Sequence, residues 1–201
     1  MVKRPFDVVF AAAALAGLAP VLLIVALIIK FSSPGPVLYR GVRVGLRGRR
    51  FRILKFRTMV ANADRIGGSS TAEDDPRITR IGTFLRRYKL DELPQFLNVL
   101  AGDMSVVGPR PQVAWAVDLY TPEQRRLLEV RPGITDEASI KFRDEGEILR
   151  GAVDPDRAYL ELIAPEKMRM GIEYVNNHSF LSDLKIIVKT ALAATRPGRE
   201  A

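Results

Sequence analysis

Two adjacent carboxylates, Asp91 and Glu92, are the first candidates for chemistry in this sequence of 201 residues. They lie in the stretch LDELPQFLNVL (residues 90–100), where apolar residues recur at helical spacing around Pro94. Proline is tolerated in the first turn of a helix, so the pattern places the helix start at about Asp91 or Glu92. Acidic residues at a helix start are usually caps that interact favourably with the helix dipole. A structural role is therefore the default interpretation of the pair.

Arginines near this pair in the sequence favour phosphate chemistry instead. Arg86 and Arg87 shortly precede Asp91, and Arg110 follows within GPRP (residues 108–111). Guanidinium groups bind phosphate oxygens well, and the chain has neither a Walker sequence nor GxGxxG for binding phosphate through backbone N–H groups. An ionised aspartate can itself attack phosphorus. The pair is thus either a helix cap or the centre of a phosphate-transfer site.

The composition narrows the possible metal chemistry. The chain has no cysteine and one histidine, His178, so disulfides, thiolate metal sites and multi-histidine centres are excluded. A metal would bind oxygen ligands, as Mg²⁺ does. Residues 1–60 hold 11 Lys and Arg against one acid, whereas the remainder holds 20 bases and 22 acids. A net positive charge confined to residues 1–60, beside an apolar stretch, predicts contact with an anionic membrane surface rather than with nucleic acid.

Residues 8–29 are an uncharged apolar run of 22 residues. As a helix they span about 33 Å, enough to cross the hydrocarbon core of a bilayer. Basic residues flank the run on both sides, which favours a cytoplasmic location for both ends. Pro20, near the middle, removes a backbone hydrogen bond and favours a bend. A re-entrant helix that bends at Pro20 and returns to the same face satisfies both flanks, and a single transmembrane span is the alternative.

The remaining sequence predicts a small β-hairpin and several helices. Residues 37–59 alternate apolar and basic side chains around a GLRG turn, and residues 61–76 have the composition of a loop. Residues 180–194 have the pattern of an amphipathic helix that lies on the membrane or packs on the core. The predicted class is α+β, mainly helical. Residues 1–31 would form a membrane hairpin, and residues 32–201 a compact cytoplasmic catalytic domain with amphipathic interfacial helices.

Four segments together resemble the bacterial sugar transferase family, and the resemblance covers nearly the whole chain. Its small size and single N-terminal membrane segment are similar to the small monotopic phosphoglycosyl transferases of that family. The segments are KFRTM (residues 55–59), DPRITRIGTFLRR (75–87), LDELPQFLNVLAGDMSVVGPRP (90–111) and RPGIT (131–135).

The resemblance implies a reaction. Sugar-1-phosphate would pass from a UDP-sugar to polyprenyl phosphate, giving polyprenyl diphosphate-sugar and UMP, as the first membrane step of glycoconjugate assembly. Asp91 would be the nucleophile that forms a covalent phosphosugar intermediate, and Glu92 its partner, with both carboxylates near Mg²⁺ as ligands. The substrate-binding residues that the resemblance implies are Lys55, Arg57, Arg86, Pro109, Arg110, Pro111 and Arg143.

The resemblance also implies a location and partners. The membrane helix would be re-entrant and broken at Pro20, with the active site at the cytoplasmic face of the bacterial inner (plasma) membrane. The expected partners are UDP-sugar, polyprenyl phosphate and membrane lipids, without nucleic acid, and a homodimer is left open.

The chain departs from the family pattern at three places. Ala19 takes the place of the serine that often precedes the hairpin proline, so the break depends on Pro20. Residues 136–139 read Asp-Glu-Ala-Ser where many members have Gly-Trp-Ala-Gln, which leaves the sugar preference open. Gly171 stands where the family commonly carries an aspartate.

Two other functions compete with this interpretation. A membrane-anchored, non-catalytic module could bind anionic lipid or nucleic acid through the basic residues 40–57, but few aromatic residues accompany those bases. A conventional glycosyltransferase would move the sugar without its phosphate. The nucleotide product separates this glycosyltransferase from the phosphosugar transferase, because phosphosugar transfer releases UMP and glycosyl transfer releases UDP.

Overall fold

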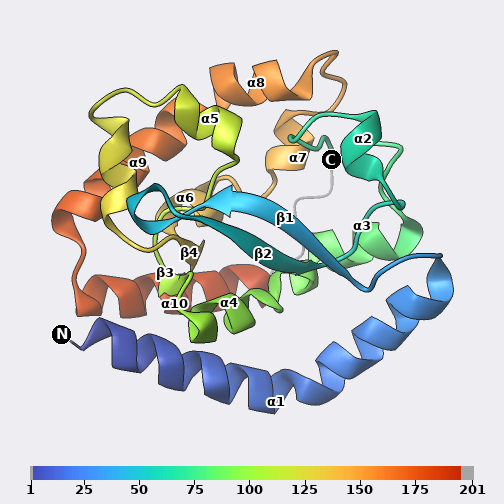
Figure 1. Ribbon diagram of the computed structural model, residues 1–201, viewed down its shortest axis with the longest axis horizontal. Helices are drawn as coiled ribbons and strands as arrows, with labels where there is room; N and C mark the ends of the chain where they lie inside the picture. Colours follow the sequence, from blue (N-terminus) through green and yellow to red (C-terminus); the bar gives the residue numbers. More distant parts are fainter. Residues whose placement is uncertain (1, 196–201) are drawn as a thin grey trace.

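The apolar N-terminal run forms one 30-residue helix, α1 (Lys3–Ser32), in the computed structural model, which describes residues 2–195. By length and composition α1 could cross a membrane, and only 11% of its most apolar window is buried. Pro20 lies inside the helix, and Figure 1 shows α1 bent near its middle, so that both arms rise toward the rest of the molecule. The predicted turn after the helix is confirmed, because α1 ends at Ser32.

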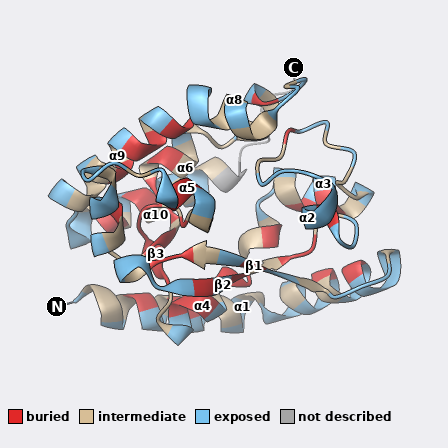
Figure 2. Ribbon diagram, turned by 45° about the horizontal axis from the view of Figure 1, so that its top comes forward, coloured by how far each residue is buried: buried red, intermediate tan, exposed pale blue. Residues whose placement is uncertain are grey.

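The two arms of α1 pack on the domain, whereas the middle of the helix does not. Asp7 and Ala11 are buried in the first arm, and Val25 and Ile29 in the second. None of residues 12–24 is buried, and Figure 2 shows α1 along one side of the molecule with much of its length exposed. This burial pattern fits a helix whose two ends return to the same body.

The predicted β-hairpin is confirmed. Strands β1 (Leu38–Val44) and β2 (Arg50–Phe56) pair antiparallel and are joined at the expected place by a 3₁₀ turn, Leu46–Gly48. The Asn98 side chain accepts the N–H of Leu54 and donates to the carbonyl of Arg52, each at 2.9 Å. These two bonds attach the helix that carries Asn98 to the middle of β2.

The rest of the chain is mainly short helices with one small parallel sheet, so the α+β, mainly helical class is confirmed. The segment expected to be a loop contains one short helix, α2. Strands β3 (Ser105–Val107) and β4 (Gly133–Thr135) pair in parallel. The helices are α2 (Ala63–Ile66), α3 (Arg80–Arg87), α4 (Gln95–Ala101), α5 (Ala114–Asp118), α6 (Glu137–Lys141), α7 (Glu145–Ile148), α8 (Pro155–Leu162), α9 (Ala164–Asn177) and α10 (Phe180–Thr195), with 3₁₀ turns at Leu90–Glu92 and Gln124–Glu129.

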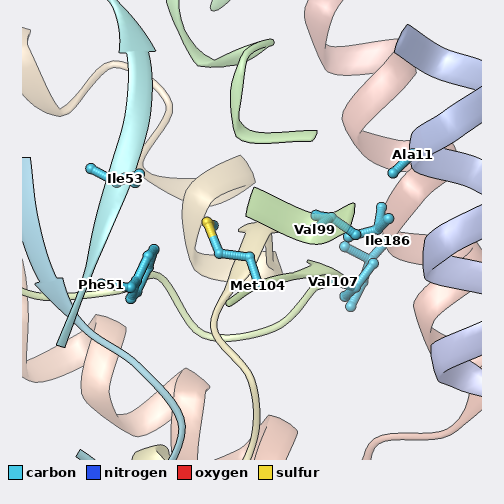
Figure 3. Close-up of a cluster of buried hydrophobic side chains, with 8 residues drawn as sticks. Ala11, Phe51, Ile53, Val99, Met104, Val107 and Ile186 are labelled. Carbon is cyan, nitrogen blue, oxygen red and sulfur yellow. The ribbon is translucent and has the colours of Figure 1, made fainter. Parts of the chain in front are cut away.

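The main hydrophobic core joins elements from both ends of the chain. Figure 3 shows Ala11 of α1, Val99 of α4 and Ile186 of α10 close together, with the hairpin residues Phe51 and Ile53 on the other side of the cluster. The predicted apolar stripe of α10 therefore serves core packing on one side. Its other side exposes Leu181, Val188 and Leu192.

A buried polar network fixes the first arm of α1 to β3. Asp7 is 2% exposed, and its carboxylate accepts the Ser105 hydroxyl at 2.8 Å and the Val106 N–H at 3.1 Å. Lys3 donates to the carbonyl of Val107 at 3.0 Å and forms an ion pair with the buried Asp183 of α10. The beginning of the apolar helix is thus bonded directly to the strand that precedes residues 108–111.

We expect Asp7→Ala to lower the free energy of unfolding by about 2–3 kcal/mol, because it leaves the Ser105 hydroxyl and the Val106 N–H buried without an acceptor. The melting temperature of the detergent-solubilised protein measures this loss. Asp118→Ala, at the exposed end of α5, is the matched control, with an expected change within about 0.5 kcal/mol. Equal melting temperatures for the two variants would show that the Asp7 network does not stabilise the fold.

Candidate active site

Asp91 and Glu92 lie in a single 3₁₀ turn and not in the first turn of a regular helix. Lys89, with a φ of 55°, directs the chain into this turn. The N–H groups of Glu92 and Leu93 bond to carbonyls three residues back, and α4 begins only at Gln95. The predicted helix start at Asp91 or Glu92 was therefore wrong by about three residues. The positive charges around the pair therefore belong to basic side chains and not to the dipole at the N-terminus of a helix.

Glu92 is held by two cations. Its Oε1 lies 2.8 Å from Lys55 Nζ of β2 and 2.6 Å from Arg110 Nη2, and its Oε2 accepts from Arg110 Nη1 at 3.2 Å. Burial alone would raise the pKa of Glu92, but Arg110 and Lys55 hold it well below its usual range. In return, Glu92 raises the pKa of Arg110. Glu92 is thus ionised, with both oxygens already engaged.

Asp91, its neighbour, has the opposite environment. Asp91 is 7% exposed, and its Oδ1 is buried without a hydrogen-bond partner in the described part of the chain. Burial raises the pKa of Asp91, against the opposing effect of Lys55 and the positive charges of Arg86 and Lys89. The only other buried side-chain atom without a partner in residues 2–195 is Nε2 of Gln95, four residues away. A carboxylate oxygen that has no hydrogen-bond partner and lies near several basic side chains is suited to binding a metal ion or attacking phosphorus.

The loop that carries Arg110 is fixed by a backbone crossing. A Cβ atom on Gly108 would lie 2.4 Å from the carbonyl oxygen of Arg131, and one on Gly133 would lie 2.1 Å from the nitrogen of Gly108. Only glycine fits at either position. The Gly133 N–H donates to the carbonyl of Pro109 at 3.1 Å. The GPRP and RPGIT segments, separate motifs in the sequence, are therefore one structural unit.

Three other predicted site residues, Arg86, Pro109 and Pro111, lie near Asp91 or Arg110. Arg86 is half-buried at the end of α3, and its charge lowers the pKa of Asp91. Pro109 and Pro111 flank Arg110 and line a cavity beside it. Lys55, Arg86 and Arg110 thus lie near the carboxylate pair, and a substrate-binding role for them and for the two prolines stays a prediction.

Arg57 and Arg143 bond to main-chain carbonyls instead. Arg57 is 7% exposed and donates to Ser33 and Pro34, each at 2.8 Å, so it closes the end of α1. Arg143 donates to the carbonyls of Arg87, at 3.4 Å, and of Ala193. Within residues 2–195, no hydrogen bond or ion pair joins Arg57 or Arg143 to either carboxylate. A role for either residue in binding substrate stays a prediction.

Sequence reasoning missed three residues next to Arg110. The Asp136 carboxylate, 6% exposed, accepts the backbone N–H of Arg110 at 3.1 Å. Glu145 forms an ion pair with the buried Lys167, and both Glu145 and Asp136 add to the raised pKa of Arg110. Glu145 and Lys167 gave no signal in the sequence, because single charged residues on amphipathic helices are common. Asp136 was visible only as a departure from the family pattern.

The departure at Gly171 also has a place in the structure. Gly171 lies on α9, and a Cβ atom there would be 2.7 Å from Leu127 Cδ2 and 3.7 Å from Pro109 Cβ. A side chain at this position would require Leu127 to move. Gly171 therefore lets α9 approach the segment behind Pro109 closely.

Comparison with known proteins identifies the class. Residues 1–197 match the bacterial sugar transferase family, so the chain belongs to that family, as the sequence resemblance predicted, and it is a transferase enzyme. Together with the apolar α1, this membership indicates association with a membrane.

Several relatives show what members of the family do. A UDP-glucose:undecaprenyl-phosphate glucose-1-phosphate transferase of Caulobacter vibrioides is 42% identical, over 94% of this chain and 67% of that protein. The exopolysaccharide production protein PSS of Rhizobium leguminosarum bv. phaseoli is 39% identical, over 99% and 98%. A UDP-N-acetylgalactosamine-undecaprenyl-phosphate N-acetylgalactosaminephosphotransferase of Aeromonas hydrophila is 37% identical, over 94% of this chain and 42% of that protein.

Replacing each carboxylate by its neutral amide should change the melting temperature in opposite directions for Asp91 and Glu92. Because the pKa of Asp91 is raised, its contribution to stability is present at low pH and is lost as the pH rises through the folded-state pKa. Asp91→Asn should therefore melt a few degrees above the wild type at pH 7, with the difference shrinking toward pH 4. Because the pKa of Glu92 is lowered, its contribution is present above its unfolded pKa, about 4.3, and is lost on acidification.

Glu92→Gln should accordingly melt below the wild type at pH 7, since Lys55 and Arg110 lose their carboxylate, at a cost of about 2–3 kcal/mol. Thermal melts of both variants and the wild type from pH 4 to pH 8 test the pair, and each variant serves as the control for the other. A lower melting temperature for Asp91→Asn at pH 7 would contradict the environment assigned to Asp91.

Proposed function

We propose that this enzyme transfers sugar-1-phosphate from a UDP-sugar to polyprenyl phosphate, giving polyprenyl diphosphate-sugar and UMP. The names of the Caulobacter vibrioides and Aeromonas hydrophila relatives support UDP-sugar and undecaprenyl phosphate as the substrates. The observation that carries the proposal is the unlike pair of neighbouring carboxylates. Glu92 is engaged by Lys55 and Arg110, whereas Asp91 keeps a buried oxygen without a partner.

Asp91 would act as the nucleophile of a two-step transfer. Its carboxylate oxygen attacks the phosphorus that carries the sugar, and the bond from that phosphorus to the bridging oxygen breaks, so UMP leaves with the bond's electron pair. An oxygen of polyprenyl phosphate then attacks the same phosphorus and releases the Asp91 carboxylate. A covalent intermediate separates two polyanionic substrates in time, so that they need never occupy the site together.

The surrounding cations would stabilise the charge that gathers on the phosphates. Arg86 acts on Asp91 through its charge, and Lys55 and Arg110 are fixed in place by Glu92. Donors held in position beforehand stabilise a transition state without reorganising during the reaction. In this scheme Glu92 is a positioning residue for the phosphate-binding cations.

Mg²⁺ is the proposed cofactor. Among residues 2–195 no three His, Cys, Asp or Glu side chains form a group that could hold a metal ion. Asp91 Oδ1 fits as one protein ligand, because it is buried and unengaged, and substrate phosphates supply further oxygens. Glu92 fits less well, since both of its oxygens already bind cations. When bound, the ion offsets the negative charge of the phosphates.

The proposed location is the cytoplasmic face of the bacterial inner membrane, with α1 as a re-entrant helix and the reaction as the first membrane step of glycoconjugate assembly. Both arms of α1 pack on the same body, and the exposed stretch between them contains Pro20. The exposed apolar side of α10 offers a further surface for lipid. Transferase family membership argues against the non-catalytic basic module.

We expect purified protein with Mg²⁺, undecaprenyl phosphate and a panel of UDP-sugars to release UMP, and Asp91→Asn to lower that rate at least a thousandfold, on the order of other nucleophile losses. Without the lipid, wild-type protein should release at most one equivalent of UMP in a burst. Intact-mass spectrometry should then show the added mass of one phosphosugar, located by peptide mapping at Asp91.

Asp118→Asn, on the exposed end of α5, is the control and should keep the wild-type rate. Release of UDP in place of UMP would show a conventional glycosyltransferase. UMP release by Asp91→Asn at the wild-type rate would refute the role of Asp91 as the nucleophile.

The path of α1 can be tested with single cysteines, because the chain has none of its own. Val2, ahead of α1, is 64% exposed. A re-entrant helix keeps Val2→Cys from reacting with an impermeant maleimide in intact spheroplasts, just like Asp118→Cys in the body of the enzyme. Both should react once the membrane is permeabilised. Labelling of Val2→Cys but not of Asp118→Cys in intact spheroplasts would show a transmembrane span.

A further inference from the structure

The backbone of Arg110 is held by a side chain that the catalytic scheme does not use. Strands β3 and β4 are parallel, and beyond them the Gly108 N–H bonds to the carbonyl of Thr135 at 3.0 Å. Two residues further on, the Arg110 N–H donates to Asp136 Oδ2 at 3.1 Å. The side chain of Asp136 thereby continues the connection between the two strands past the end of their backbone pairing.

The sequence around Arg110 makes this contact unusually important. Pro109 and Pro111 have no backbone N–H, so Arg110 supplies the single main-chain donor of the Pro-Arg-Pro segment. That donor goes to Asp136, while the guanidinium of the same residue forms two hydrogen bonds to Glu92. Arg110 is therefore fixed at both ends, by one carboxylate at its backbone and another at its side chain.

Asp136 also has a second, purely structural role. Its Oδ1 accepts the N–H of Ser139 at 2.5 Å and so caps the N-terminus of α6. Helix capping would explain an aspartate here without any connection to the active site. The two roles use different oxygens of one carboxylate, which makes them separable by substitution.

We propose that Asp136 is a positioning residue that fixes the Arg110 guanidinium for the phosphosugar transfer. This inference rests on the proposed function. Asp136 is 6% exposed, so water does not readily replace it as the acceptor for the Arg110 N–H. Without that acceptor, the Pro-Arg-Pro segment keeps the Gly133 N–H on the Pro109 carbonyl but loses its connection at Arg110. The guanidinium then approaches Glu92 and the phosphates in a wider range of positions.

The position of Asp136 gives the proposal significance for this chain in particular. Residues 136–139 are the segment in which the chain departs from the Gly-Trp-Ala-Gln of many family members. A glycine has no side chain to accept the Arg110 N–H. A glycine at residue 136 of this chain would therefore leave the Arg110 N–H without its acceptor.

Asp136→Asn separates the two roles. Asparagine is as good a helix cap as aspartate, so Oδ1 can still cap α6, but the amide group then presents N–H atoms to the Arg110 N–H. Asp136→Ser also keeps a capping oxygen, on a side chain too short to serve both partners. Asp154→Asn is the matched control, because Asp154 caps the exposed α8 through the N–H of Arg157 at 3.1 Å.

The first measurement is hydrogen–deuterium exchange at the Arg110 amide. Its proline neighbours carry no amide hydrogen, so a short peptide isolates this site. We expect exchange at Arg110 to accelerate about tenfold or more in Asp136→Asn and Asp136→Ser, and to stay at the wild-type rate in Asp154→Asn. Wild-type exchange in both Asp136 variants would overturn the proposal, whether or not the protein releases UMP.

The second measurement is UMP release. We expect kcat/KM to fall about ten- to a hundredfold in both Asp136 variants, with melting temperatures a few degrees below that of the wild type because the Arg110 N–H loses its acceptor, and both quantities to be unchanged in Asp154→Asn. In an Arg110→Lys background the Asp136 substitutions should have little further effect, because they act through Arg110. Wild-type rates in the Asp136 variants, or an undiminished loss in the Arg110→Lys background, would refute the positioning role. A wild-type protein that releases no UMP would instead refute the proposed function.

Discussion

The ion-pair cluster of Glu92 with Lys55 and Arg110 is the interaction on which the arrangement of the site depends. Lys55 comes from the hairpin, Glu92 from the turn before α4, and Arg110 from the loop after β3. Three otherwise separate parts of the fold thus meet at one carboxylate. A partly buried ion pair of this kind contributes little net stability unless every charge has a partner, and here each has one. Its main effect is to fix where two cations stand.

The neighbouring Asp91 shows why the pair must be unequal. If both carboxylates were engaged by cations, neither would be free to react, and if both were unengaged, two negative charges would be buried side by side at a high cost. Lys55 and Arg110 both donate hydrogen bonds to Glu92, whereas Asp91 receives no hydrogen bond from them and is affected only by the charge of Lys55, with those of Arg86 and Lys89. In the proposed mechanism, Glu92 thereby positions the cations, and Asp91 stays available as the nucleophile.

Local patterns in the sequence predicted what local forces determine. The hairpin at residues 38–56 follows from alternating side chains around a turn, and the end of α1 from the turn residues after Ser32. The helix start at Asp91 was misplaced, because Lys89 and a 3₁₀ turn there depend on how α3 meets α4. The contacts of Asp136 and Glu145 with their neighbours join residues 22 to 26 positions apart. No periodicity records such contacts, so a single sequence did not reveal them.

The bonds of Asp7 to β3 have a mechanical consequence. The first arm of α1, β3 and the loop that carries Arg110 are consecutive links, joined by the Asp7 carboxylate at one point and by the chain itself at the next. Together they connect the apolar helix α1 to the Arg110 guanidinium. A displacement of the first arm of α1 would therefore also move β3 and, through the chain, the loop that carries Arg110.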